Sequence, residues 1–182
     1  MISATLRDIL PDKNTLKKKL HVSKPVEENL VNSIYDEAPF IFTPEYSYKK
    51  VKFSQAPLSF MLESSCGLKT AMDGALEGFV VICTIGGEYK KSAEKYGLYL
   101  DRFASDLVEN LAEHTSHVLL KKFYYAGHLL TKRYSPGYGD LKLDTQKDIF
   151  ALFGDEKISI TLTESFYMDP EKSISYIVGV KK

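Results

Sequence analysis

The sequence has little of several features that mark particular classes of protein. It contains only two cysteines, Cys66 and Cys83, and neither lies in a CxxC pair, which excludes a disulfide framework and gives a zinc site no support. No apolar run approaches the roughly 20 residues that cross a bilayer, and the opening stretch MISATLRDILPDK has no signal-peptide core. We therefore expect a cytoplasmic protein with reduced thiols and no membrane association.

An excess of charge of one sign is also missing. The 182 residues include 24 Lys and Arg against 24 Asp and Glu, which gives a formal net charge of zero. Such a balance argues against a surface dominated by nucleic-acid or anionic-membrane binding. Hydrophobic residues make up 44% and charged residues 26% of the chain, as in globular proteins that bury one core. We expect a single domain over residues 1–182 that binds no nucleic acid.

The common catalytic and phosphate-binding motifs are absent as well. The stretch GFVVICTIGG (78–87) places glycines after an apolar strand, but neither GxGxxG nor GxxxxGK[ST] is present. There is no GxSxG, and no histidine is placed by the sequence beside a cysteine, so nucleophilic catalysis has no support.

What the sequence does contain is a clear alternation of helical and strand periodicities. The longest apolar stripe with helical spacing predicts one long helix over 98–122. Period-two alternation near the C-terminus predicts strands of a half-buried sheet. Together these patterns favour an α+β fold, a mainly antiparallel twisted sheet with one long helix and several short helices. The predicted helices are 14–20, 25–37, 88–96, 98–122 and 145–153, and the predicted strands are one or two within 40–63, including Leu58–Leu62, then 78–87, 158–163 and 173–180.

The long helix carries a strip of acidic residues along one side. Asp106, Glu109 and Glu113, followed by His117, are spaced so that they project along one line of the helix. Such strips are commonly solvated faces. A metal site would need matching ligands from other helices, which the sequence does not show. A third use, a carboxylate beside a bound cation, requires only one of these acids and a pocket.

The stretch RYSPGYGD (133–140) combines an arginine, a proline, two glycines and two tyrosines. Ser135-Pro136-Gly137 is typical of a structural turn, because proline presets φ and glycine accepts positive φ. The same residues also suit a binding loop, in which arginine pairs with a carboxylate, glycine lets a ligand approach the backbone, and tyrosine offers a flat face. The stretch by itself leaves both interpretations open.

Three consecutive motifs resemble those of one family. They are RxxxGY (Arg133, Gly137 and Tyr138), the helix QKDIFALFG (146–154) and the run ITLTESFYMDPEKSIS (160–175). In order and spacing they resemble the activation domain of cobalamin-dependent methionine synthase. The family resemblance is clearest over residues 78–178. Within this range, the stretches VVICTIGGEYKK and DLVENLAEH show a weaker likeness than the three motifs.

The resemblance implies that S-adenosylmethionine is the ligand. Arg133 would pair with its carboxylate or ribose oxygens, and Glu109 would stabilise its positive charge, with Glu113 as the neighbouring acid. Relatives carry an aromatic residue at the position of Val178, and Tyr176, two residues earlier on the same strand face, is expected to substitute for it. The residues implied in S-adenosylmethionine binding are Arg133, Pro136, Gly137, Tyr138, Glu109, Glu113 and Tyr176, with no metal ligand and no catalytic residue among them.

The resemblance also implies a function that involves other proteins. It implies a free-standing activation protein that supports reductive remethylation of cob(II)alamin on a separate cobalamin-dependent methionine synthase. The partner's cobalamin-binding module would carry the cobalamin, and flavodoxin or a similar carrier would supply the electron. The chain would position the methyl donor and would not be catalytic alone.

Two other functions stay open at this point. One is a corrinoid-protein adaptor of the same fold that does not bind S-adenosylmethionine. The other is a small stand-alone enzyme that uses the acidic strip of the long helix.

Overall fold

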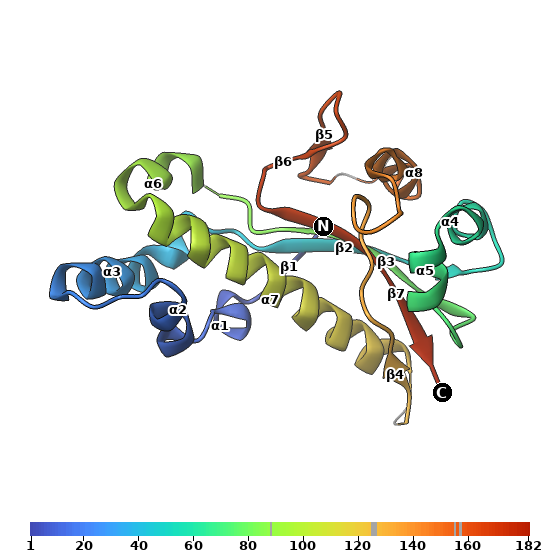
Figure 1. The fold of residues 1–182 in the computed structure, drawn as a ribbon, viewed down its shortest axis with the longest axis horizontal. Helices are drawn as coiled ribbons and strands as arrows, with labels where there is room; N and C mark the ends of the chain where they lie inside the picture. Colours follow the sequence, from blue (N-terminus) through green and yellow to red (C-terminus); the bar gives the residue numbers. More distant parts are fainter. Residues whose placement is uncertain (88, 125–126, 155, 157) are drawn as a thin grey trace.

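A five-stranded antiparallel sheet forms the middle of the fold (Figure 1). The structure is a computed structural model and describes residues 1–87, 89–124, 127–154, 156 and 158–182. The strand order is β1-β2-β3-β7-β4, and β5 and β6 form a separate two-stranded sheet. The strands are β1 (Ile2–Ser3), β2 (Glu45–Lys52), β3 (Glu77–Thr84), β4 (Leu129–Leu130), β5 (Thr161–Leu162), β6 (Met168–Asp169) and β7 (Ser173–Lys181).

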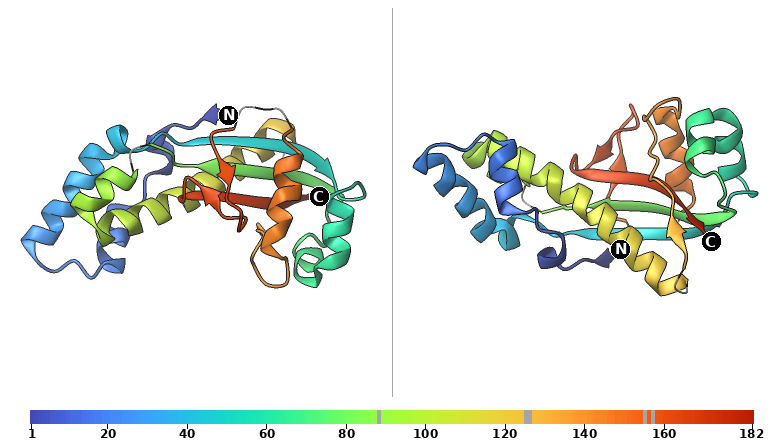
Figure 2. Two further views of the ribbon diagram at one scale, coloured as in Figure 1. Left: turned by 90° about the horizontal axis from the view of Figure 1, so that it is seen from above. Right: turned by 60° about the horizontal axis from the view of Figure 1, so that its bottom comes forward.

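Helices cover both faces of this sheet (Figure 2). The helices are α1 (Leu6–Ile9), α2 (Lys13–Lys19), α3 (Pro25–Ile41), α4 (Leu58–Ser64), α5 (Cys66–Ala71), α6 (Tyr89–Tyr96), α7 (Leu98–Phe123) and α8 (Gln146–Ala151), with a 3-10 turn at Leu143–Thr145. This arrangement confirms the predicted α+β fold with an antiparallel sheet and one long helix.

The central strand β3 is buried from Gly78 to Thr84 because both of its faces are covered. Phe79 and Val81 point into the core beneath α7, whereas Val80 and Ile82 point into the core beneath α4, α5 and α8. This division explains why the sequence of β3 is a continuous apolar run, since a strand buried on both faces has no polar side to alternate with.

The long helix α7 extends along one face of the sheet and confirms the prediction over 98–122. It begins after Gly97, whose φ of 53° suits glycine. Leu100, Phe103, Leu107 and Leu111 are fully buried at helical spacing and form its core-facing stripe. The helix therefore owes its place to tertiary burial of this stripe.

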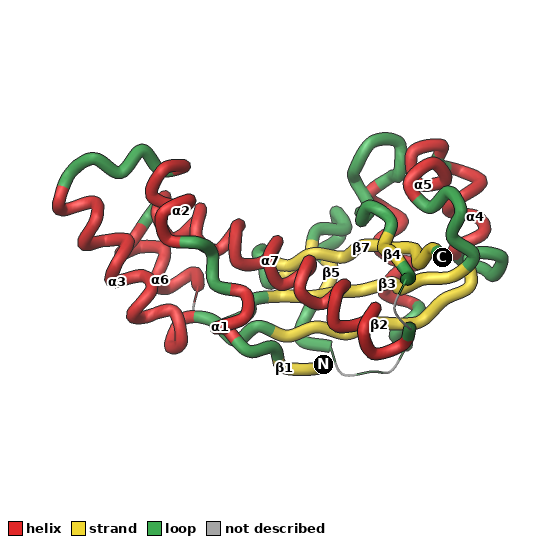
Figure 3. The backbone as a smooth tube through the Cα atoms, turned by 90° about the horizontal axis from the view of Figure 1, so that it is seen from below, coloured by secondary structure: helices red, strands yellow, loops and turns green. Residues whose placement is uncertain are grey.

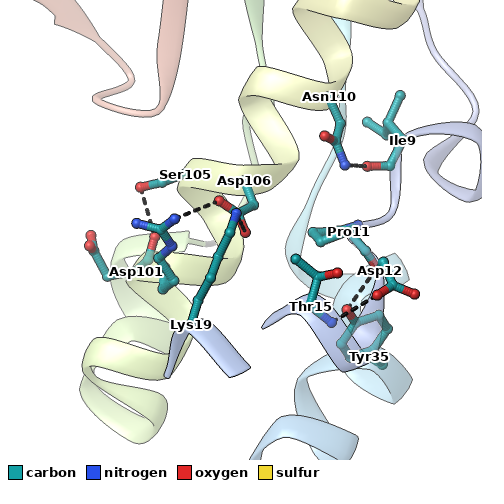
Figure 4. A network of polar contacts seen from close by, with 11 residues as sticks. Ile9, Pro11, Asp12, Thr15, Lys19, Tyr35, Asp101, Ser105, Asp106 and Asn110 are labelled. Carbon is teal, nitrogen blue, oxygen red and sulfur yellow. Dashed lines mark hydrogen bonds and ion pairs between the residues drawn. The ribbon is translucent and has the colours of Figure 1, made fainter. Parts of the chain in front are cut away.

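The N-terminal segment is tied to α7 by polar contacts (Figure 4). Lys19 forms an ion pair with Asp106 at 2.8 Å, and the Asn110 side chain donates to the carbonyl of Ile9 at 3.0 Å. Figure 3 shows α2, α3 and α6 gathered at one end of the molecule, with α4 and α5 at the other. One acid of the predicted strip, Asp106, thus has a structural partner.

Several predicted elements differ from the structure. Leu58–Leu62, predicted as a strand, lies in α4, because Leu58 and Met61 are both buried at the i, i+3 spacing of a helix. The helix predicted to end at Glu37 continues to Ile41 and contains Pro39 in its last turn. Pro39 cannot donate a backbone hydrogen bond, but the helix still closes through the amide of Phe42, which donates to the carbonyl of Ala38. Helix α5 was not predicted.

One predicted strand is shorter than expected, and one predicted helix is described only in part. Of the strand expected over 158–163, only Thr161–Leu162 pairs, and its partner is Met168–Asp169 in the small sheet. Helix α6 is described from Tyr89, so residue 88 of the predicted helix 88–96 lies outside the described residues. In the ranges that the structure describes, no helix combines the length and apolarity needed to cross a membrane.

Candidate functional site

A cleft of about 930 Å³ opens between α5, α7 and the edge of the sheet. Glu109 contributes from α7, Thr70 from α5, Ile174 from β7, and Arg133 and Tyr138 from the segment after β4. Its volume is within the range of small-molecule sites. Predicted residues from α7 and from the RYSPGYGD loop therefore meet at one surface.

The segment that carries Arg133 extends the edge of the sheet. Tyr134 and Ile177 exchange two backbone hydrogen bonds, at 2.9 and 2.8 Å, and Thr131 donates to the carbonyl of Gly179 at 2.9 Å. Neighbouring side chains of an extended segment point to opposite faces. Arg133 consequently faces α7, whereas Tyr134 packs into the core beneath α5.

Arg133 is held between an acid and an aromatic ring. Its Nη2 lies 3.0 Å from Oε2 of Glu109, and its guanidinium carbon lies 5.5 Å from the centre of the Tyr176 ring. The two charged side chains are 29% and 60% exposed, so solvent screens their attraction and the pair is weak. Both charges can exchange this partner for another at low cost.

Tyr176 lies beneath Arg133 and is fully buried. Its hydroxyl donates to the carbonyl of Ala112 at 2.8 Å and lies 2.9 Å from the hydroxyl of Ser116, both in α7. Burial raises the pKa of Tyr176 far above its usual value. Tyr176 thus touches Arg133 with its ring, and its hydroxyl points into the core and away from the cleft.

The loop after Arg133 is a tight turn, as its glycines and proline predict. Gly137 has a φ of 83°, and its amide donates to the carbonyl of Leu141 at 2.8 Å. The amide of Tyr138 donates to the carbonyl of Ser135 at 3.1 Å. Pro136 is buried. The turn leaves Tyr138 68% exposed at the cleft, with its ring 5.5 Å from that of Tyr134 in an edge-on contact. A structural turn and an exposed aromatic face thus coexist in this loop.

Glu113 is not brought to the cleft. It lies with His117 and Asp8 in a separate groove of about 300 Å³. The acidic strip is therefore divided, because Asp106 pairs with Lys19, Glu109 pairs with Arg133, and Glu113 faces this groove. Among the described residues, no three His, Cys, Asp or Glu side chains are grouped so that they could hold a metal ion.

Several residues that carried the family resemblance have structural roles. The buried hydroxyl of Ser175 donates to Oε1 of Gln146 at 2.5 Å, which holds α8 against β7. Ser173 donates to the carbonyl of Pro170 at 2.6 Å. In the turn Thr84-Ile85-Gly86, which belongs to the stretch VVICTIGGEYKK, the amide of Gly86 donates to the hydroxyl of Thr84 at 3.0 Å. The spacing of these motifs thus reflects how the segments around the cleft are held together.

The wall that α5 supplies was missed by sequence reasoning. Thr70 and Gly67 line the cleft, and Ser65 caps the helix by accepting from the amide of Leu68 at 2.9 Å. The only local signal was this serine at N-cap spacing, which marks a helix start but gives no hint of what the helix faces.

These features define an α+β protein with a ligand-sized cleft at the edge of an antiparallel sheet. Among solved structures, the chain is similar to the MetH reactivation domain in a crystal structure with bound AdoHcy, with a TM-score of 0.60 and 14% sequence identity. The similarity covers 98% of this chain and 77% of that one, so the chain has the fold of that reactivation domain. No protein family and no curated protein matches the sequence.

Proposed function

We propose that this chain is an S-adenosylmethionine-binding activation protein for cobalamin-dependent methionine synthase. One observation carries the proposal: the chain has the fold of a reactivation domain crystallised with AdoHcy, the demethylated form of S-adenosylmethionine, over 98% of its length. The meeting of Arg133, Glu109 and Tyr138 at one cleft supports it, because the family resemblance implies these same residues in ligand binding.

The charges of the cleft suit a ligand that carries both signs. S-adenosylmethionine has a carboxylate, an ammonium and a sulfonium group. Arg133 offers its fork to the carboxylate, and Glu109 offers a carboxylate to the positive groups. The ligand would replace the Arg133–Glu109 ion pair by two new pairs, and little is lost because both side chains are partly exposed.

The loop beside Arg133 suits the flat part of the ligand. Tyr138 presents a ring that is largely exposed at the cleft, on which an adenine can stack. Gly137 has no side chain, so the backbone can approach the ligand closely. We assign Pro136 to the support of this turn, because it is buried next to Gly137.

The proposed role of the chain is to hold the methyl donor in place. Cobalamin, carried by the cobalamin-binding module of a separate methionine synthase, would accept the methyl group after reduction by flavodoxin or a similar electron carrier. Arg133 and Glu109 would fix the orientation of the donor, and transfer to the metal requires no general base from this chain.

Calorimetric titration with S-adenosylmethionine tests the binding step. The parent protein should bind one equivalent, and Arg133→Ala should abolish the binding heat. Arg102→Ala is the matched control. It also removes an arginine that pairs with an acid of α7, Asp106 at 3.3 Å, but neither residue lines the cleft. Equal binding by Arg133→Ala and the parent would refute the site.

Reactivation of a methionine synthase that lacks this module tests the rest of the proposal. Recovery of activity should require this chain, S-adenosylmethionine and an electron donor together. An adaptor without a ligand would bind the cobalamin module but give no calorimetric response. A stand-alone enzyme would turn over a substrate without any partner.

A further inference from the structure

The RYSPGYGD loop (133–140) is attached to α5 through one carboxylate, that of Asp140. Oδ1 of Asp140 accepts from the hydroxyl of Ser65 at 2.5 Å and from the amide of Gly67 at 3.2 Å. The hydroxyl of Tyr134 donates to the same oxygen at 3.3 Å. Asp140 thus joins both ends of the turn that carries Tyr138 to a helix about seventy residues earlier in the sequence.

Two glycines let these segments approach. A Cβ added to Gly67 or to Gly139 would lie closer than 3.0 Å to the Tyr134 hydroxyl, a distance that real side chains essentially never show. Tyr134 is 8% exposed, and Ser65 is fully buried. The loop and α5 are therefore packed against each other with no space for side chains between them.

This packing sets the distance between two walls of the cleft. Gly67 and Thr70 line it from α5, and Tyr138 lines it from the loop. The ring of Tyr138 packs edge-on against Tyr134, whose hydroxyl is bound to Asp140. A shift of the loop relative to α5 would therefore move Tyr138 and alter the width of the cleft.

We propose that Asp140 is a positioning residue, which fixes the turn with Tyr138 against α5 and so preorganises the cleft for its ligand. The proposal rests on the proposed function, since it takes S-adenosylmethionine as that ligand. Hydrogen bonds from Ser65 and Gly67 also hold the pKa of Asp140 below its usual value, which is the effect expected of donors that stabilise a carboxylate.

The test compares Asp140→Ala with Asp144→Ala, which removes the same charge from the same segment but not the contact with Ser65. Calorimetry should show S-adenosylmethionine binding about tenfold weaker in Asp140→Ala, the effect of losing charge-assisted hydrogen bonds that order the site. Asp140→Asn should be intermediate, because its amide oxygen still accepts from Ser65 and Gly67 without the charge. Asp144→Ala should bind like the parent.

A second measurement needs no ligand. Amide hydrogen exchange of residues 133–141 in the free protein should be faster in Asp140→Ala than in the parent, and unchanged in Asp144→Ala. If exchange and affinity both stay at parental values, or if exchange rises while affinity does not change, Asp140 does not position the site. If the parent binds no S-adenosylmethionine, the proposed function fails, and the exchange result still decides whether Asp140 orders the loop.

Discussion

The substitution Tyr176→Phe separates a role in the core from a role in the cleft. It removes the hydroxyl that donates to the Ala112 carbonyl at 2.8 Å and contacts the Ser116 hydroxyl at 2.9 Å, and it keeps the ring beneath Arg133. The Ala112 carbonyl keeps a second donor, the hydroxyl of Ser116 at 2.9 Å, so no buried acceptor is left unpaired. Tyr176 and Ser116 bring two hydroxyl protons to these contacts and the variant keeps one, so one net hydrogen bond of about 0.5–1.5 kcal/mol is lost.

We therefore expect the free energy of unfolding to fall by about 0.5–1.5 kcal/mol. In a protein of this size, that loss lowers the melting temperature by about 1–6 °C. Binding of S-adenosylmethionine should stay within about twofold of the parent, because the ring still supports the guanidinium of Arg133. Chemical denaturation and calorimetric titration of the same preparation measure the two quantities. Tyr167→Phe is the stability control, since this tyrosine is 64% exposed.

The variant Tyr176→Leu completes the test. It removes the ring as well, so binding should weaken about two- to fivefold through loss of the cation–π contact, and stability should fall by about 3 kcal/mol. If Tyr176→Phe weakened binding as strongly as Arg133→Ala, the hydroxyl of Tyr176 would contact the ligand directly. The assignment of this hydroxyl to the core would then be wrong. An unchanged stability would refute the hydrogen-bond argument.

The remaining predictions concern the acidic strip and the two thiols. Glu109→Gln should weaken S-adenosylmethionine binding about tenfold, by loss of a charged partner. Glu113→Gln, in the separate groove, should leave the calorimetric affinity unchanged. Equal effects of the two variants would show that Glu109 and Glu113 do not lie in different sites. Burial raises the pKa of Cys83 to about 12, whereas Cys66 is exposed, so a thiol reagent at pH 8 should modify Cys66 alone until the protein is unfolded. Two rapidly reacting thiols in the folded protein would contradict this assignment.

Much of the secondary structure could be predicted because it depends on local patterns. Helix α7 and strands β3 and β7 have long, regular apolar patterns, and the turn at Pro136-Gly137 follows from the φ values that these residues favour. The strand predicted at Leu58–Leu62 was wrong because an apolar run this short fits a strand and a helix equally well. Only burial of one of its sides made it a helix.

The site could be predicted only in part. Arg133 and Glu109 were named together through the family resemblance, and the structure shows them 3.0 Å apart. The contact between Asp140 and Ser65 had no signal in the sequence, because it depends on how α5 is placed beside an edge segment seventy-five residues away. Contacts of this kind are decided by packing, which local propensity does not contain.

The sequence by itself determined the chemistry available to this protein. It contains an arginine before a glycine turn, an acidic helix and an α+β order of elements, and it has no motif for covalent catalysis by cysteine or serine. The tertiary structure alone decided which of these groups meet. Asp106, Glu109 and Glu113 lie along one side of the same helix, yet each faces a different neighbour. The reason is physical: helical spacing places side chains on a line, but the segments that pack along that line, brought there by burial of apolar surface, give each carboxylate its partner.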